Sequence, residues 1–194
     1  MKAFAIRALA LLLLGVAGLP AAAETVLPPG AAPAEDARAL HAYAPAGNPG
    51  ATGFEVADRA AIVNLIYAYA FAYDNGEAAA WFSLFAADAQ FVAGMPGEPA
   101  VSFEGEGFHS FWTERMSAFR KSGSLRRHLM SNILFLEQTA DSAHVSVVGL
   151  LTSAENGRAF VAVSSLNYEG WLVKGPDGWK IRRWHDFPDV AFRQ

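Results

Sequence analysis

The apolar residues between positions 58 and 74 follow a helical spacing. They recur every three or four positions and end at an Asp-Asn-Gly turn signal; the set is Ile62, Leu65, Ile66, Tyr69 and Tyr73. This pattern predicts a helix with Asp58 as its N-cap and Gly76 just after its end, where glycine tolerates the left-handed conformation. Phe71 and several alanines make the other side apolar too, so we expect the helix to be buried nearly all round.

Shorter patterns predict the elements that follow this helix. An aromatic helix is expected over 78–85, a strand over 88–92, a loop over 94–99, an extended segment over 101–104 and a helix over 107–120. Extended segments are then expected over 127–137, 144–153, 159–173 and 179–187, with hairpin signals at Glu155-Asn156-Gly157 and Gly175-Pro176-Asp177-Gly178. Helices followed by an antiparallel meander predict an α+β fold.

The N-terminus has the three regions of a secretory signal. Lys2 and Arg7 precede an apolar run over 9–16, and three alanines follow at 21–23. The apolar run is well short of the roughly 20 residues that span a bilayer, which favours a cleaved signal peptide over 1–23. We therefore expect an exported protein, periplasmic or secreted, with no membrane span after cleavage.

Composition divides the rest of the chain into two parts. Residues 24–54 are rich in Ala, Pro and Gly and are expected to form a disordered leader, and 55–194 to form the folded domain. The chain of 194 residues has a formal charge of −4, which becomes −6 when Lys2 and Arg7 are removed with the signal peptide. An acidic domain is a poor partner for nucleic acid.

Several kinds of site are excluded by the residues that are missing. The chain has no cysteine, which rules out disulfides, thiol nucleophiles and thiolate metal sites. The sequence also lacks a nucleophile elbow, a phosphate-binding loop and the paired histidines of zinc enzymes. We therefore predict no metal and no cofactor.

Candidate chemistry gathers around two residues far apart in the sequence. Asp74 follows Tyr73 at the end of the first helix, where its carboxylate either begins the turn or faces an apolar cavity. On the strand from position 127, period-two geometry places His128, Met130 and Asn132 on one face. A buried histidine needs a partner, and Asp74 is the obvious acceptor. His128 is then either a core histidine or a general acid–base group.

Together these segments resemble the SnoaL-like branch of the nuclear transport factor 2-like superfamily, and within it the scytalone dehydratase-like group. The resemblance covers about 55–189. It rests on the helix that ends at Tyr73-Asp74, the stretch from 81 to 89, the strand with His128 and Asn132, and the closing hairpin over 177–181. It implies a cone: a strongly bent antiparallel sheet wrapped over N-terminal helices, with a pocket inside. It also implies a homodimer.

The resemblance carries expectations about chemistry as well. Enzymes of this group are cofactor-free dehydratases, isomerases and cyclases that act on hydrophobic substrates. Their dehydratases use a tyrosine-held water, an aspartate and two histidines, and Tyr73, Asp74 and His128 match three of these four positions. The second histidine belongs on the next long strand, where this chain has only apolar residues and glycine over 147–151.

Three functions stay open on the sequence alone. In the first, a cofactor-independent isomerase or lyase uses Asp74 and His128 to move a proton on a small hydrophobic molecule of polyketide or aromatic type. Tyr73 and Asn132 would position the oxygen of this molecule. In the second, the same cavity binds such a molecule without turnover. The third, a structural module, predicts a filled core. The residues expected to contact the substrate are Tyr69, Trp81, Phe85, Met130 and Asn132.

Overall fold

The computed structural model of the protein describes residues 30–33, 55–155, 157 and 159–191. Its helices are α2 (Val56–Asp74), α3 (Ala78–Phe82) and α4 (Gly105–Ser122). Its strands are β1 (Ala31–Pro33), β2 (Phe85–Ala93), β3 (Val101–Glu104), β4 (Ser124–Gln138), β5 (Ser142–Glu155), β6 (Ala159–Gly175) and β7 (Gly178–Pro188). The predicted signal peptide over 1–23 and most of the predicted leader over 24–54 lie outside the described residues.

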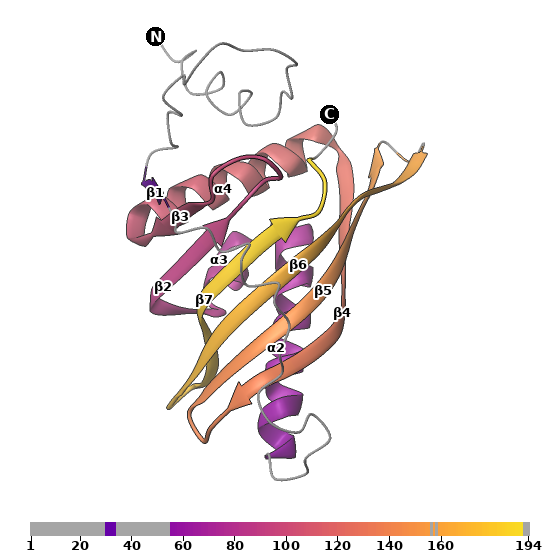
Figure 1. Ribbon diagram of the computed structural model, residues 1–194. Helices are drawn as coiled ribbons and strands as arrows, with labels where there is room; N and C mark the ends of the chain where they lie inside the picture. The colour runs from indigo at the N-terminus through magenta and orange to yellow at the C-terminus, as the bar shows by residue number, and fades with distance from the viewer. Residues whose placement is uncertain (1–29, 34–54, 156, 158, 192–194) are drawn as a thin grey trace.

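The strands form one sheet in the order β1-β3-β2-β7-β6-β5-β4. The last four strands of the chain pair antiparallel with their sequence neighbours, which confirms the predicted meander. Strand β2 pairs in parallel with β7, a long-range contact that no turn signal in the sequence indicates. Figure 1 shows the long strands curving around α2, while α4 lies beside β2 and β3. The fold is therefore α+β, with a strongly curved sheet wrapped over helices.

Helix α2 packs only one of its faces against the sheet. Its buried apolar residues are Ile62, Ile66, Tyr69, Ala70 and Tyr73. Tyr67 and Phe71 are 44% and 70% exposed, so the expectation of a helix buried nearly all round is wrong. The helix ends as predicted: Gly76 has a φ of +67° and donates its backbone N–H to the Tyr73 carbonyl at 3.0 Å.

The start of α2 also differs from the prediction. The N-cap is Glu55, and Asp58 lies inside the first turn. The Asp58 carboxylate instead accepts hydrogen bonds from the Lys174 ammonium at 3.0 Å and from the Trp179 indole at 2.9 Å. Asp58 therefore ties the helix to the β6–β7 hairpin, because two donors from the sheet outcompete the local backbone.

A short part of the predicted disordered leader is ordered. Ala31–Pro33 pair with β3 as an edge strand, so the prediction of disorder is wrong for these residues. Gly30 lies so close to Gly107 that a Cβ on Gly30 would stand 2.3 Å from the Gly107 Cα. This close approach explains the glycine at position 107 in the first turn of α4, since no larger residue there would leave room for the strand.

Aromatic side chains fill most of the space between the helices and the sheet. Trp81, Phe91, Phe103, Tyr168 and Trp184 are each at most 1% exposed. Burying one large apolar side chain contributes about 1.5–3 kcal/mol, so this cluster dominates the stability of a domain that has no disulfide. Few polar side chains are buried among these rings, so each buried polar side chain is a candidate for a functional role.

Candidate active site

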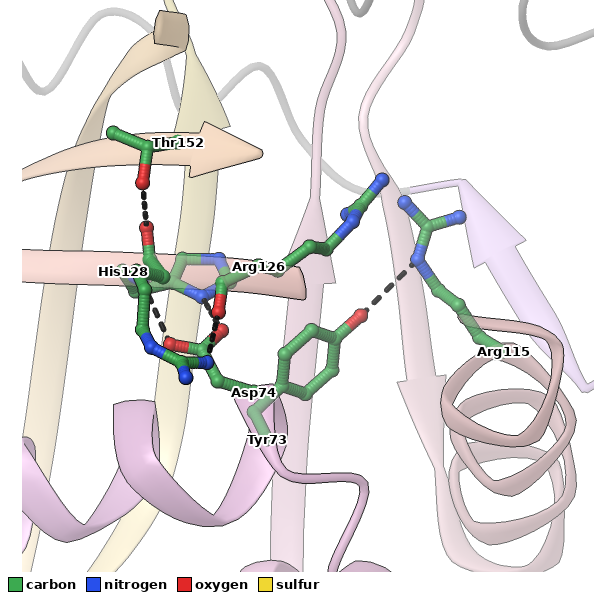
Figure 2. Close-up of polar contacts among 7 residues, drawn as sticks. Tyr73, Asp74, Arg115, Arg126, His128 and Thr152 are labelled. Carbon is green, nitrogen blue, oxygen red and sulfur yellow. Dashed lines mark hydrogen bonds and ion pairs between the residues drawn. The ribbon is translucent and has the colours of Figure 1, made fainter. Parts of the chain in front are cut away.

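The end of α2 brings Asp74 against the middle of β4. The Asp74 Oδ1 atom lies 2.6 Å from His128 Nδ1, and its Oδ2 accepts the His128 backbone N–H at 2.7 Å. Figure 2 shows the carboxylate reaching from the helix end to both groups. The two side chains are only 5% and 7% exposed. The predicted partnership of these residues is therefore present.

Two local features of the chain place His128 here. Gly123, at the end of α4, has a left-handed φ of +71° and lets the chain turn directly into β4. From Ser124 onward, alternate residues of β4 are shielded and exposed, which puts Arg126, His128 and Met130 on the inner face. Period-two geometry thus sets the direction of the imidazole, as the sequence predicted.

The same alternation fails two residues later. Asn132 has a φ of +48° and lies in a bulge, where the pairing of β4 with β5 shifts between Ser131 and Leu134. Its side chain is exposed. The prediction that Asn132 shares the face of His128 is wrong, because the extra residue of a bulge reverses the direction of the side chain.

The Tyr73 hydroxyl has a cationic neighbour, Arg115. The Tyr73 ring packs edge-on against His128, with ring centroids 5.4 Å apart. The Arg115 Nε on α4 donates a hydrogen bond to the hydroxyl at 3.2 Å. Burial raises the pKa of Tyr73, against the opposing influence of Arg115 and Arg126, so the hydroxyl keeps its proton at neutral pH.

Two arginines converge beside this hydroxyl. Arg126 stacks on the Phe119 ring with its guanidinium carbon 3.6 Å from the ring centroid, and that of Arg115 lies 5.0 Å from the same centroid. Figure 2 shows both guanidinium groups on the side of Tyr73 that faces away from Asp74. Helix α4 and strand β4 therefore place two positive charges next to the phenol.

A second carboxylate faces the interior from β7. Asp186 is paired in register with Tyr168, and both the Asp186 Oδ1 and the Tyr168 hydroxyl are buried with no hydrogen-bond partner among the described residues. Burial raises the pKa of Asp186 to about 6, while His128 and Arg115 act in the opposite direction. The charge environment of Asp186 is thus set by two residues, His128 and Arg115, that also contact Asp74 and Tyr73.

Open space lies at one end of this cluster. A pocket of about 230 Å³ is bordered by the end of α2, the end of α4 and the start of β4. Its lining includes Tyr73, Asp74, Met116, Phe119 and Arg126. The aspartate of the pair thus borders a pocket with both apolar and basic walls.

The other predicted contact residues lie deeper. Tyr69, Trp81, Phe85 and Met130 are between 0% and 8% exposed and belong to the hydrophobic core. The Tyr69 ring stands 5.5 Å from that of Trp81 and 6.2 Å from that of Phe85, measured between centroids. Of the predicted site residues, Tyr73, Asp74 and His128 come together in the polar cluster, and these four form the packed apolar wall behind it.

Three polar residues of the cluster are not predicted from the sequence. Arg126 lies one residue before the strand start expected at 127. It has the same parity as His128, so a strand extended by one residue would have included it on the same face. Arg115 has no signal beyond its helical position. Asp186 is overlooked because the sequence draws attention to it only as a neighbour of His185. The two residues point to opposite faces of the strand, as expected, and only Asp186 faces the site.

No group of three or more His, Cys, Asp or Glu side chains suited to a metal ion occurs in the part of the chain that the structure describes. Among the same residues, no helix is both long enough and apolar enough to cross a membrane.

Solved structures with a similar fold come from several bacteria. ActVI-ORFA from Streptomyces coelicolor is 20% identical, with a TM-score of 0.55, and the alignment covers 68% of this chain and 96% of that one. A nuclear transport factor 2-like protein with a cystatin-like fold from Novosphingobium aromaticivorans is 18% identical, with a TM-score of 0.57 and coverage of 69% and 83%. A candidate scytalone dehydratase from the same organism is also 18% identical, with a TM-score of 0.58 and coverage of 72% and 90%.

These structural similarities show the fold. The family is shown by a profile that matches the sequence. No curated protein matches the chain. The family profile described as SnoaL-like domain matches residues 55–185, which is more than half of the chain and includes every residue of the polar cluster except Asp186. The protein therefore belongs to the SnoaL-like family of the nuclear transport factor 2-like superfamily.

Proposed function

We propose that this protein is a cofactor-independent isomerase or lyase that moves a proton on a small hydrophobic substrate. The observation that carries the proposal is the 2.6 Å contact between Asp74 Oδ1 and His128 Nδ1 at the end of α2. Family membership and the fold shared with ActVI-ORFA and the candidate scytalone dehydratase support the reaction class.

The contact fixes the roles of the two ring nitrogens. A carboxylate only accepts hydrogen bonds, so Nδ1 carries the proton and Nε2 is the basic atom of the neutral ring. None of the described residues makes a hydrogen bond with His128 Nε2. In the proposed reaction, Nε2 takes a proton from a carbon next to a substrate carbonyl and returns it, or passes it to a leaving group. Asp74 stabilises the imidazolium that forms in between.

Tyr73 and Asp186 complete the proposed machinery. The protonated Tyr73 hydroxyl, which accepts a bond from Arg115, can donate its own proton to the oxygen on which negative charge develops. Asp186, with its unpartnered Oδ1 and a pKa of about 6, can accept or deliver a second proton near neutral pH. It would serve where the dehydratase pattern has its second histidine.

Proton exchange into an activated ketone tests this proposal without knowledge of the natural substrate. We expect the protein to catalyse deuterium uptake at the benzylic α-carbon of 2-tetralone in D₂O, followed by NMR. Replacing His128 with Gln should lower the rate by roughly 10²- to 10⁴-fold, the usual contribution of a general base. Asp74→Asn should lower it too, because an amide can donate to Nδ1 and hold the wrong tautomer.

The outer face of the sheet offers a matched control. His144 Nε2 lies 2.6 Å from Glu169 Oε1, a contact of the same length in a place remote from the pocket. His144→Gln should therefore leave the exchange rate unchanged. A rate and pH profile shared by wild type and His128→Gln would overturn the acid–base proposal.

One observation favours a second candidate, a binding protein without turnover. Asp74 Oδ2 also accepts the His128 backbone N–H, so the carboxylate can serve simply to fasten β4 to α2. A protein of this kind would bind a hydrophobic ligand, lose little affinity on Asp74→Asn, and release the ligand unchanged. Recovery of chemically altered or deuterated ligand would exclude it.

We infer further that the protein works as a homodimer outside the cytoplasm. Three apolar side chains on the outer sheet face, Leu129, Val148 and Leu150, are 51%, 41% and 39% exposed. Leu129 and Leu150 are register partners on β4 and β5, so the patch is continuous. A second copy seated on this patch would cover it, as the family resemblance implies. The signal pattern over 1–23 supports export.

A further inference from the structure

The β5–β6 hairpin carries exposed apolar side chains on both of its faces. Phe160 is 76% exposed and Val161 is 51% exposed. Successive residues of a strand point to opposite sides of the sheet, so these two side chains lie on opposite faces of the hairpin. A protein docked on one face would cover only one of them.

This part of the hairpin lies beside the pocket at the end of α2. Across β5, Phe160 is in line with Leu125 and Val161 is in line with Arg126, and both of these β4 residues line the pocket. Leu125 is itself 57% exposed. Figure 1 shows the end of β5 and the start of β6 at the same end of the sheet as the turn from α4 into β4. The exposed apolar side chains therefore continue from the pocket to the hairpin.

Basic side chains border the same end of the molecule. Arg120, Lys121 and Arg127 follow each other along the end of α4 and the start of β4, and all three are exposed. The bonds that Arg120 and Arg127 donate go to backbone carbonyls, which carry no net charge. None of the three belongs to an ion pair among the described residues. Their positive charges therefore face the solvent.

Few acidic side chains offset this charge. The segments that meet here contribute Asp74 and Glu155. The Asp74 side chain is only 5% exposed, and its carboxylate is bound to His128. The chain as a whole, in contrast, has a formal charge of −4. The exposed charge at this end is therefore mainly positive on a protein that is acidic overall.

We propose that this end of the molecule binds the surface of an anionic lipid bilayer, without spanning it. The interfacial region of a bilayer surrounds a short hairpin and so covers both Phe160 and Val161, whereas anionic headgroups match Arg120, Lys121 and Arg127. The acidic remainder of the protein is repelled by the same surface, which fixes the orientation.

This orientation turns the pocket toward the lipid. Leu125 and Arg127 line the pocket and also belong to the proposed membrane-binding surface. A hydrophobic substrate would then pass between the bilayer and the pocket without crossing water. The inference rests on the proposed function only in taking this pocket as the substrate site.

Spin labels at single cysteines test the proposal, since the natural chain has no cysteine. We would attach a nitroxide to Phe160→Cys and to Val161→Cys in the full-length protein and add vesicles of phosphatidylcholine and phosphatidylglycerol. Collision rates with oxygen and with a water-soluble nickel chelate tell lipid from water. We expect both labels to enter the lipid, and a label at Phe71→Cys, on the exposed side of α2, to stay in water.

Charge variants test the headgroup contacts. Lys121→Gln and Arg127→Gln should each weaken binding to the anionic vesicles roughly fivefold. Arg183→Gln removes a charge from β7, where Arg183 packs over Trp171 at 5.2 Å, and should leave binding unchanged. Every variant keeps the same N-terminus, so any binding through residues 1–23 contributes equally to all of them.

Several results would overturn the membrane-binding surface. One is a label at position 160 or 161 that stays in water when vesicles are present. Another is a loss with Arg183→Gln as large as that with Arg127→Gln. Labels that leave water without vesicles, as the protein concentration rises, would assign the hairpin to a second copy of the chain instead. None of these results would affect the acid–base proposal, because the exchange of 2-tetralone is measured without lipid.

Discussion

Single residues in the site serve two purposes at once. Asp74 binds the ring and the backbone of His128, so the same carboxylate orients the imidazole and joins α2 to β4. Tyr73 packs in the core through its ring and enters the polar cluster through its hydroxyl. Asp186 differs from both, because its buried Oδ1 has no partner among the described residues. An unpaired buried oxygen costs about 1–3 kcal/mol, and such a cost is commonly found at functional sites.

The burial of the Asp186 carboxylate predicts that the free energy of unfolding depends on pH. Its pKa rises from 3.8 in the unfolded chain to about 6 in the fold, chiefly because of burial. Between these values the folded protein holds a proton that the unfolded chain has released. The contribution of Asp186 to the free energy of unfolding is therefore fully present below pH 3.8 and is lost as the pH rises through 6.

Urea unfolding at several pH values measures this effect. The free energy of unfolding of Asp186→Asn, relative to that of wild type, should rise by about 1–3 kcal/mol as the pH increases from 4 to 7. The reason is that the amide has no charge to desolvate. Asp88→Asn, at a carboxylate whose side chain is 60% exposed, is the matched control and should show no comparable trend. A difference between Asp186→Asn and wild type that stays constant with pH would contradict the assignment.

At the scale of elements, β4 is the strand that builds the site, and its bulge decides where the site ends. Arg126, His128 and Met130 follow regular alternation, and the left-handed residue Asn132 interrupts it. Asparagine adopts this conformation more readily than other residues with a Cβ, because its short polar side chain can bond locally. The bulge thus separates the residues of β4 in the polar cluster from the part of the strand that follows Asn132.

Substitutions at the bulge test this account. Asn132→Val should lower the free energy of unfolding by about 1–2 kcal/mol, since a β-branched residue is strained at a positive φ. Asn132→Gly should stay within about 0.5 kcal/mol of wild type. Ser131→Val, next to the bulge in an exposed strand position, serves as the control. Equal stability of the Val and Gly variants at position 132, measured by urea unfolding, would exclude backbone strain there.

At the scale of the whole molecule, the two faces of the sheet have different uses. The inner face carries the core and the polar cluster, and the outer face carries the exposed patch of Leu129, Val148 and Leu150. The proposed dimer therefore uses the face of the sheet that lies opposite the core.

A charge in the patch should separate the copies. Leu150→Lys is expected to convert the dimer to a monomer in sedimentation velocity, because an unpaired ammonium is costly to bury in an apolar interface. Phe71→Lys, at a residue of α2 that is 70% exposed and far from the patch, should remain dimeric. A wild-type protein that sediments as a monomer at all concentrations would reject the proposed dimer.

Local sequence patterns determined most of the elements of this protein. The spacing of apolar residues predicted α2, α4 and the four long strands, and glycine-containing turn signals predicted where α2 and the β6–β7 hairpin turn. Parity along β4, with the need of a buried histidine for an acceptor, also predicted the Asp74–His128 pair. The elements depend on neighbours within a few positions of the chain, so a single sequence contains them. The pair joins residues 54 positions apart and was inferred from the chemistry of its two side chains.

Only the tertiary structure decided what surrounds the pair. Arg115 reaches Tyr73 because α4 packs beside α2, and Asp186 reaches the cluster because β7 lies between β2 and β6. The parallel pairing of β2 with β7 joins segments about 90 positions apart, and no local periodicity encodes such a contact. The same holds for the bulge at Asn132, which depends on the registration of β4 with β5. The charge and the second carboxylate of the site are therefore products of packing, whereas its histidine and first carboxylate follow from local pattern.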